Sequence, residues 1–426
     1  MTSHMENIIT DVSVVDNSAI NHKEKHMQRL TFLFASIFVL VLAVMIPLAQ
    51  AQTFTALHQF ATQTDGAFPE GAVLRDAAGN LYGTTTSGFQ LDGGTVFKID
   101  SRGNESILFA FNNGPVTGLF PTGTLIQDQP GNLYGVALGG PGAGVLYKVS
   151  PQGKEAILFA FQGGLGVDTP ELPAGGIIMD KSGNIFGAAE FGSDQSCEIG
   201  CGSIFQLDPV GNLNLLHKFT GGSDGGNPIG PLVQDADGNL YGVAQSGGDL
   251  SCPEQFLFPG AGCGVVFRVA ANGDLTVLHT FTGGKDGAVP QGGLLLDAAG
   301  NLYGTAALGG KADNGTVFRI TKDGKYKTFH RFTSTQGKNP NGGLVADPAG
   351  NLYGTAQQGG NQNLGTAFEL SPTGKLKVLH NFQGLEDGAV PFAGLFRDDA
   401  GHLYGTTVKN FLIQIVQGGN VFEITP

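Results

Sequence analysis

Short apolar runs bounded by glycine, asparagine or aspartate recur from residue 53 to the end of the chain. In one stretch, the runs Leu275–Phe281, GGLLLD (292–297), LYGTA (302–306) and GTVFRI (315–320) follow one another. They are rich in β-branched and aromatic residues, and none has the spacing or length of a helix. The pattern therefore predicts an all-β chain of short antiparallel strands.

One phrase marks the period of this pattern. It reads GNLYG, or once GNIFG and once GHLYG, and begins at Gly79, Gly131, Gly183, Gly238, Gly300, Gly350 and Gly401. A period of about 50 residues is typical of solenoids and propellers, and four strands per period fit a propeller blade. The sequence predicts a seven-bladed β-propeller with four antiparallel strands in each blade.

An aspartate precedes each motif glycine by three residues, as Asp76 precedes Gly79. Aspartate at the first position of a type I turn accepts a backbone hydrogen bond, and glycine at the fourth supplies the positive φ that closes a hairpin with a bulge. We therefore expect these aspartates to be turn residues, and the motif tyrosines to pack between blades.

The two ends of the repeat region complement each other. Phe54–Phe60 resembles a fourth strand of the repeat, and Asn420–Ile424 resembles a third. Joined, they would complete the last blade, with the N-terminal strand on its outer edge. Such closure removes the open sheet edges that invite aggregation.

Residues 1–51 have the features of a leader and signal peptide. Arg29 precedes an apolar run over residues 30–48, and Ala49-Gln50-Ala51 forms a small-residue cleavage site. We expect cleavage after Ala51 and a mature propeller of residues 52–426, located in the periplasm or the medium. An uncleaved anchor is the alternative, because the apolar run is nearly long enough to span a bilayer.

Charge and cysteine content narrow the class further. The net charge of −13 and the lack of a basic stripe argue against nucleic acid as a partner, and we expect a monomer. The cysteines fall in two neighbouring units, as Cys197, Cys201, Cys252 and Cys263. In an exported protein they predict disulfides. Of the three possible pairings, the two local ones are favoured over cross-blade pairs or a metal site.

Histidine offers little chemistry in this pattern. Five fourth strands carry a histidine two residues before a phenylalanine, at His58, His217, His279, His330 and His380. The other two units place Phe109 and Phe159 there. Because the position accepts either ring, it is interpreted as a packing position, and no catalytic residue or metal centre is predicted.

Two groups of loops are candidates for a binding rim. Acidic Asp-Gly loops lead into first strands at Asp65, Asp224, Asp286 and Asp387, and the last three are assigned to the rim. They could hold calcium, although turn formation is the simpler explanation and no cofactor is otherwise expected. Apolar residues occur in two other loops, at Phe256, Leu257, Phe258, Phe411 and Leu412. These could contact a protein or cell-envelope partner, or pack down onto the propeller.

The phrase DxxGNLYGTT, followed by GG, GTVF and LHxF, resembles the Gloeobacter/Verrucomicrobia tandem repeat of exported bacterial "choice-of-anchor" proteins, over residues 53–426. The resemblance implies export and a repeat fold, without an established activity. Members often carry a C-terminal sorting anchor, whereas this sequence stops at Pro426 after its last strand.

The leading hypothesis is an exported, non-catalytic binding scaffold. The rival is a carbohydrate-active or lactonase-like enzyme using carboxylates at the channel mouth. A glycan ligand is possible in principle, but the chain has no tryptophan to stack on a sugar.

Overall fold

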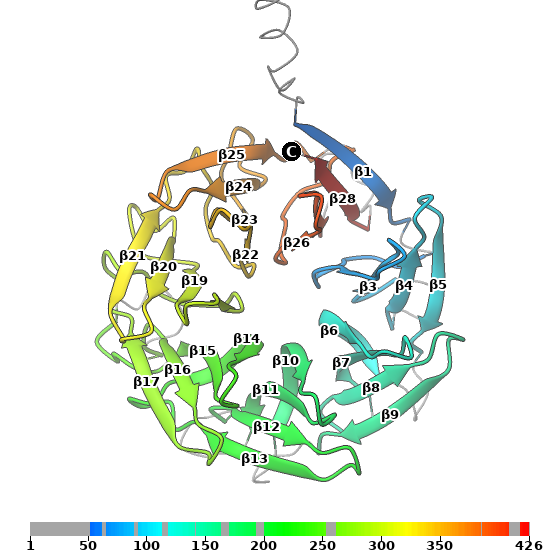
Figure 1. Cartoon of the computed structure of the whole chain (residues 1–426), viewed down its shortest axis with the longest axis horizontal. Helices are drawn as coiled ribbons and strands as arrows, with labels where there is room; N and C mark the ends of the chain where they lie inside the picture. Colours follow the sequence, from blue (N-terminus) through cyan, green and yellow to red (C-terminus); the bar gives the residue numbers. More distant parts are fainter. Residues whose placement is uncertain are drawn as a thin grey trace, which may run out of the picture. The chain divides into compact units, whose positions relative to one another are not determined.

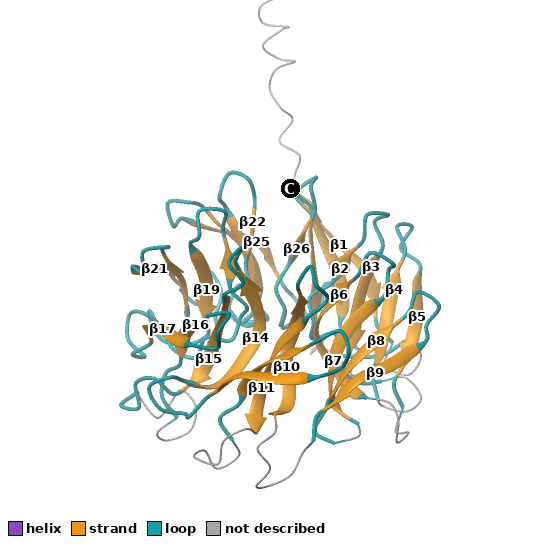
Figure 2. Cartoon of the chain, turned by 60° about the horizontal axis from the view of Figure 1, so that its bottom comes forward, coloured by secondary structure: helices purple, strands orange, loops and turns teal. Residues whose placement is uncertain are grey.

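The computed structural model describes residues 52–61, 65–88, 93–112, 118–140, 142–162, 170–192, 200–252, 261–384, 386–408 and 418–425. All of them belong to the compact unit Gln52–Pro426, and the predicted leader lies outside the described residues. The regular structure of this part is entirely β, as Figure 2 shows. No helix in it is long and apolar enough to cross a membrane.

Strands follow one another in sets of four around a ring (Figure 1). Five sets form separate sheets: β2 (Leu74–Arg75), β3 (Leu81–Thr85), β4 (Thr95–Ile99) and β5 (Glu105–Ala110); β14 (Gly226–Gln234), β15 (Leu240–Ser246), β16 (Val265–Val269) and β17 (Leu275–Thr280); β18 (Leu295–Leu296), β19 (Leu302–Ala306), β20 (Thr316–Ile320) and β21 (Tyr326–Arg331); β22 (Val345–Ala346), β23 (Leu352–Ala356), β24 (Thr366–Leu370) and β25 (Leu376–Asn381); β26 (Phe396–Arg397), β27 (Leu403–Thr407), β28 (Asn420–Thr425) and β1 (Thr53–Gln59).

The other strands form one sheet of eight. It holds β6 (Leu119–Gln127), β7 (Leu133–Gly139), β8 (Val145–Val149), β9 (Glu155–Ala160), β10 (Pro170–Met179), β11 (Ile185–Gly192), β12 (Ser203–Leu207) and β13 (Leu213–Lys218). Its order, β13-β12-β11-β10-β6-β7-β8-β9, places two four-strand sets side by side.

The propeller-like, all-β arrangement is confirmed, but the prediction of seven separate blades is corrected to five four-stranded sheets and one eight-stranded sheet. A single parallel bridge between Gly176 and Thr124 joins β10 to β6. The two backbones can meet there because glycines line the contact: a Cβ on Gly123 would lie 2.7 Å from the backbone nitrogen of Gly176.

Closure by the N-terminal strand is confirmed. β1 pairs antiparallel with β28, from Thr53 opposite Thr425 to Gln59 opposite Asn420, and forms the outer edge of its sheet. The two ends of the repeat region thus share one sheet, as their complementary sequences predict.

The motif aspartates form the predicted turns. The backbone N–H of Gly79 donates to the carbonyl of Asp76 at 3.0 Å, and Gly79 has a φ of 86°. The carboxylate of Asp76 also accepts hydrogen bonds from the Asn80 side chain at 2.7 Å and from the Tyr82 hydroxyl at 2.9 Å. The motif therefore closes on itself through side chains as well as through the backbone.

The core lies between neighbouring sheets and is built from aromatic pairs. The phenylalanine directly after each outer strand meets a third-strand ring of the next sheet edge-on, with ring centroids 5.0–5.3 Å apart. Phe60 and Phe97 are one such pair, and both are fully buried. The last motif glycine makes room for this ring, because a Cβ on Gly83 would lie 2.5 Å from the Phe97 ring.

Candidate functional site

A strained turn is repeated seven times at the inner ends of the sheets. The residue before a proline has a φ of 51–58° in every repeat, at Phe68, Phe120, Leu172, Asn227, Val289, Asn339 and Val390. Positive φ is unusual for any non-glycine residue, especially a β-branched valine, and costs on the order of 1–3 kcal/mol. The shared turn fixes where the residue after each proline lies.

Those following residues ring one central cavity. The cavity has a volume of about 480 Å³. The residues that follow the seven prolines all line it: Glu70, Thr122, Ala174, Ile229, Gln291, Asn341 and Phe392. Figure 1 shows the inner strands β6, β10, β14, β22 and β26 grouped around this middle region.

The backbone around the cavity is packed so closely that it leaves no room for side chains at several glycines. A Cβ on Gly71 would lie 2.1 Å from the carbonyl oxygen of Gly123, and one on Gly175 would lie 2.2 Å from the backbone nitrogen of Gly230. Small residues are therefore required beside the cavity ring. The residue type at the ring position itself is different in every repeat, so these seven side chains determine the polarity of the cavity wall.

Polar and apolar residues occupy different arcs of the ring. Ala174 and Ile229 come from consecutive units, as do Gln291 and Asn341. Phe392 follows Asn341 in the ring order and is 43% exposed, although it lines the cavity. The Oδ1 atom of Asn341 is buried and has no hydrogen-bond partner among the described residues. The cavity thus offers an aromatic face beside amide groups.

A chain of hydrogen bonds crosses three units at the wall. The amide of Gln291 donates to Oε1 of Gln245 at 2.9 Å, and the amide of Gln245 donates to Oε1 of Glu190 at 2.7 Å. Burial raises the pKa of Glu190, and the hydrogen bond from Gln245 only partly offsets this effect. The Glu190 carboxyl group and the Gln291 amide, which both line the cavity, are therefore linked through Gln245 and held in fixed orientations.

Most side chains of the described cavity lining are uncharged. Its ionisable side chains are Glu70 and Glu190, and no histidine, cysteine, serine or lysine accompanies them among the described lining residues.

The predicted rim aspartates are each paired with a histidine. Asp224, Asp286 and Asp387 lie 3.2, 3.3 and 2.9 Å from Nε2 of the histidine seven residues earlier, in three different sheets. Burial acts to raise the pKa of Asp286, but hydrogen bonds from His279 and Thr282 outweigh it and lower the pKa. These contacts hold each outer strand to the loop that follows it.

Sequence reasoning missed these pairs, although their constant seven-residue spacing was visible. It also missed the cavity ring, because the ring residues share no type. Its packing interpretation of the histidines is incomplete. His279 stacks on Tyr326 with centroids 3.6 Å apart and also contacts Asp286.

Of the other predicted site residues, the apolar loop residues Phe256, Leu257, Phe258, Phe411 and Leu412 lie outside the described part of the chain. Cys252 and Cys263 form the local disulfide that was favoured. Cys201 is also disulfide-bonded, whereas Cys197 lies outside the described residues.

Fold and site together define an all-β, propeller-like repeat protein with a cavity at the centre of its ring. The chain belongs to the Gloeobacter/Verrucomicrobia repeat family, whose sequence model matches residues 44–197 and 259–426. This match confirms the resemblance seen in the repeat motif. No curated protein sequence matches the chain.

Several solved structures share the fold at low identity. An extracellular domain assigned to a hybrid two-component system of B. thetaiotaomicron is 12% identical with a TM-score of 0.53, and the match covers 88% of this chain and 41% of that one. A protein of Bacteroides fragilis assigned as a 6-phosphogluconolactonase is 16% identical with a TM-score of 0.51, covering 83% and 99%. A gluconolactonase of Xanthomonas campestris is 14% identical with a TM-score of 0.46, covering 88% and 89%. At these identities the likeness concerns the fold alone.

Proposed function

We propose that the protein is an exported, non-catalytic binding scaffold that holds a small ligand in its central cavity. The observation that carries this proposal is the cavity ring: one position per repeat, fixed by an identical strained turn, has a different side chain in each repeat. A purely structural ring would be expected to repeat its side chains as it repeats its glycines. The cavity volume of about 480 Å³ also lies in the usual range for small-molecule sites.

The chemistry of the wall favours a neutral, polyhydroxylated ligand such as a glycan fragment. Glu70 and Glu190 are the charged groups among the described lining residues, so an anionic ligand would meet repulsion without a compensating cation. Gln291 and Asn341 offer amide hydrogen bonds. Phe392 offers a partly exposed ring on which an apolar sugar face could stack, as tryptophan does in other proteins.

Export is supported by the disulfide chemistry. The bond between Cys252 and Cys263 is of the kind that persists in oxidising compartments. The proposed signal peptide of residues 1–51, cleaved after Ala51, would direct the chain there. Contact of the loop residues Phe256 to Phe258, Phe411 and Leu412 with a protein or envelope partner stays a prediction.

A lactonase-like activity is the second candidate, and one observation favours it. Glu190 lies at the cavity with a raised pKa, as expected of a group that donates or accepts a proton during catalysis. Hydrolysis of sugar lactones that is abolished by Glu190→Gln would support this alternative. Turnover that the substitution leaves unchanged would exclude a role for Glu190.

The proposed function is tested by a thermal-shift screen of the purified protein against neutral mono- and oligosaccharides, sugar acids and calcium. A bound ligand at 100 times its dissociation constant should add about 2.7 kcal/mol to the free energy of unfolding. Neutral saccharides are expected to raise the Tm, and Asn341→Leu to abolish the rise. The control Val210→Asn, at an 84% exposed turn position, should retain it. A rise that is equal in all three proteins would contradict binding in the cavity.

A further inference from the structure

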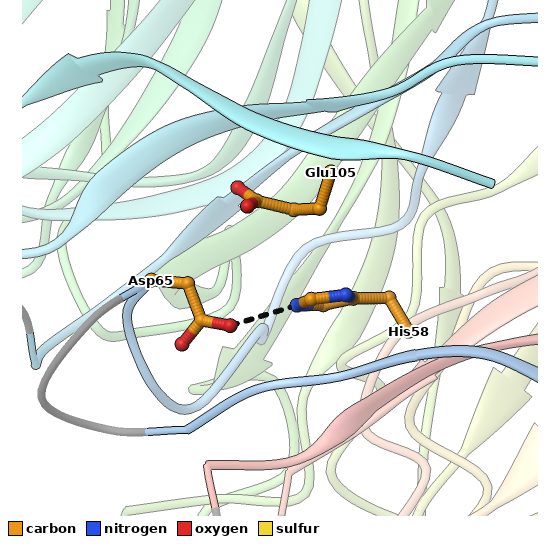
Figure 3. A group of neighbouring side chains, drawn as sticks. All are labelled: His58, Asp65 and Glu105. Carbon is orange, nitrogen blue, oxygen red and sulfur yellow. Dashed lines mark hydrogen bonds and ion pairs between the residues drawn. The ribbon is translucent and has the colours of Figure 1, made fainter.

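Three ionisable side chains meet between the closing sheet and its neighbour (Figure 3). His58 lies on β1, Asp65 on the loop that follows β1, and Glu105 at the start of β5. Nε2 of His58 is 2.9 Å from Oδ2 of Asp65, and one ligand atom from each of the three residues lies within 4.8 Å of the others. No other such group of three occurs among the described residues.

Glu105 lies at a register position where other repeats carry an aromatic residue, a leucine or another glutamate. At two other interfaces the residue in this register position stacks on the histidine of the preceding sheet: Tyr326 stacks on His279 with centroids 3.6 Å apart, and Phe54, opposite Ile424 in β28, stacks on His380 at 4.0 Å. Glu105 holds the equivalent register position, opposite Ile99. Beside His58, a carboxylate thus occupies the position from which an aromatic ring stacks on His279 and His380.

Burying the Glu105 carboxylate beside that of Asp65 is costly unless a cation is present. Asp65 is 9% exposed, and its Oδ1 atom already accepts a hydrogen bond from the backbone N–H of Ala61 at 2.7 Å. Oε1 of Glu105 is buried without a hydrogen-bond partner among the described residues. Burial raises the pKa of Glu105; nearby His58 acts to lower it and the Asp65 carboxylate to raise it further.

We propose that His58, Asp65 and Glu105 bind one divalent transition-metal ion, with zinc as the best-matched test ion. Zinc takes histidine nitrogen and carboxylate oxygen at about 2 Å, which places its donors about 3 to 4 Å apart, and solvent can supply a fourth ligand. The three donor atoms need only small side-chain movements to reach that spacing. Calcium prefers six to eight oxygen ligands, so one imidazole and two carboxylates suit it poorly.

The ion would neutralise two neighbouring carboxylates. Binding requires the lone pair of Nε2 of His58, so the ring carries its one proton on Nδ1, and any further proton on His58 or Glu105 leaves to solvent. The ion would also tie β1 to β5. β1, at the outer edge of its sheet, is the strand that closes the ring, and its ladder partner is β28. The bound ion would therefore cross-link β1 to β5, next to the β1–β28 pairing that closes the ring.

Zinc binding to the metal-stripped protein tests this proposal, with Glu105→Gln as the variant and Glu155→Gln as the matched control. Glu155 begins β9 at the same register position, and its Oε1 is also buried without a partner among the described residues. The preceding outer strand, β5, carries Phe109 at the position where β1 carries His58. Calorimetric titration and cobalt(II) absorption report the binding, and thermal melts with zinc or EDTA report the coupling to stability.

We expect one tight equivalent of zinc in the wild-type protein and in Glu155→Gln, and at least a tenfold weaker affinity in Glu105→Gln. In EDTA, Glu105→Gln should melt at or above the wild-type temperature, because it lacks the buried carboxylate. In zinc it should melt below the wild type. Equal zinc affinity in the two variants, or no tight site in the wild type, would overturn the proposal.

Discussion

The hydroxyl of Tyr82 donates to Oδ2 of Asp76 at 2.9 Å, and the same oxygen accepts a hydrogen bond from the Asn80 side chain at 2.7 Å. Matching Tyr-Asp bonds occur at Tyr134, Tyr241, Tyr353 and Tyr404. Burial raises the pKa of Tyr82 to about 12, and the bond to Asp76 adds to the effect. The repeat motif is therefore a hydrogen-bonded unit that fastens the first hairpin turn to the second strand.

Loss of the carboxylate should be more damaging than loss of the hydroxyl. Asp128→Ala removes the acceptor for the backbone and side chain of Asn132 and for the Tyr134 hydroxyl. We expect a loss of about 2 to 3 kcal/mol in the free energy of unfolding, and about 1 kcal/mol for Tyr134→Phe. Urea denaturation of the two variants checks the order. Equal losses would show that the tyrosine bond dominates.

Acid should unfold the protein through these same turns. For Asp76, Asp128 and Asp235, burial acts to raise the pKa, but the hydrogen bonds from the Asn and Tyr side chains and the backbone outweigh it and lower the pKa below 3.8. The folded state then binds fewer protons than the unfolded state, so this stability is present above the unfolded pKa and is lost as the pH falls through the folded pKa. We expect the urea midpoint to drop steeply below pH 4. A flat midpoint from pH 5 to pH 2 would contradict this role.

The last motif glycine should not tolerate a methyl group. In Gly405→Ala, the new Cβ would lie 2.5 Å from the ring of Phe422. Such overpacking costs about 1 to 3 kcal/mol. The double variant Gly405→Ala, Phe422→Leu should recover part of that loss. Gly284→Ala is the control, since its nearest neighbour would be 3.6 Å away, and a loss there as large as at Gly405 would argue against the steric explanation.

The disulfide between Cys252 and Cys263 should stabilise the fourth repeat. It closes a loop with a sequence separation of 11 residues, and both cysteines are buried. Cross-linking a loop of this size adds about 3 kcal/mol in the chain-entropy view. The variant Cys252→Ser, Cys263→Ser should lower the Tm, and a reductant, which also reduces the disulfide of Cys201, should lower it at least as much. An unchanged Tm in both experiments would show that the bond does not restrain the unfolded chain.

Turns and ring closure could be predicted from the sequence, because they depend on local spacing and on glycine, proline and aspartate. The pairing of β1 with β28 is the longest-range example. It could be predicted because each end of the repeat region lacks the strand that the other end supplies. The fused eight-stranded sheet could not be predicted, since it depends on one bridge between Gly176 and Thr124. Its cause is the close approach of two backbones, which motif spacing does not report.

The candidate sites were harder to predict for opposite reasons. The cavity ring was hidden because its members, such as Glu70 and Phe392, share only their place after a proline. The cluster around His58 was hidden because Glu105 reaches it from the neighbouring sheet. The sequence interpretation gave all aligned residues of the repeat the same role. Glu105 shows that a different residue type at one packing position changes the chemistry of a single interface between sheets.

Ligand binding to a protein with a filled cavity tests the central claim most directly. Ile229 lines the cavity and is partly exposed, so Ile229→Trp would occupy space that the ligand needs. The dissociation constant of the best saccharide from the thermal-shift screen would be measured by calorimetry for the wild type, for Ile229→Trp and for the surface control Val210→Asn. We predict at least a hundredfold loss of affinity in Ile229→Trp alone. Undiminished binding by the filled variant would contradict a ligand site at the centre of the ring.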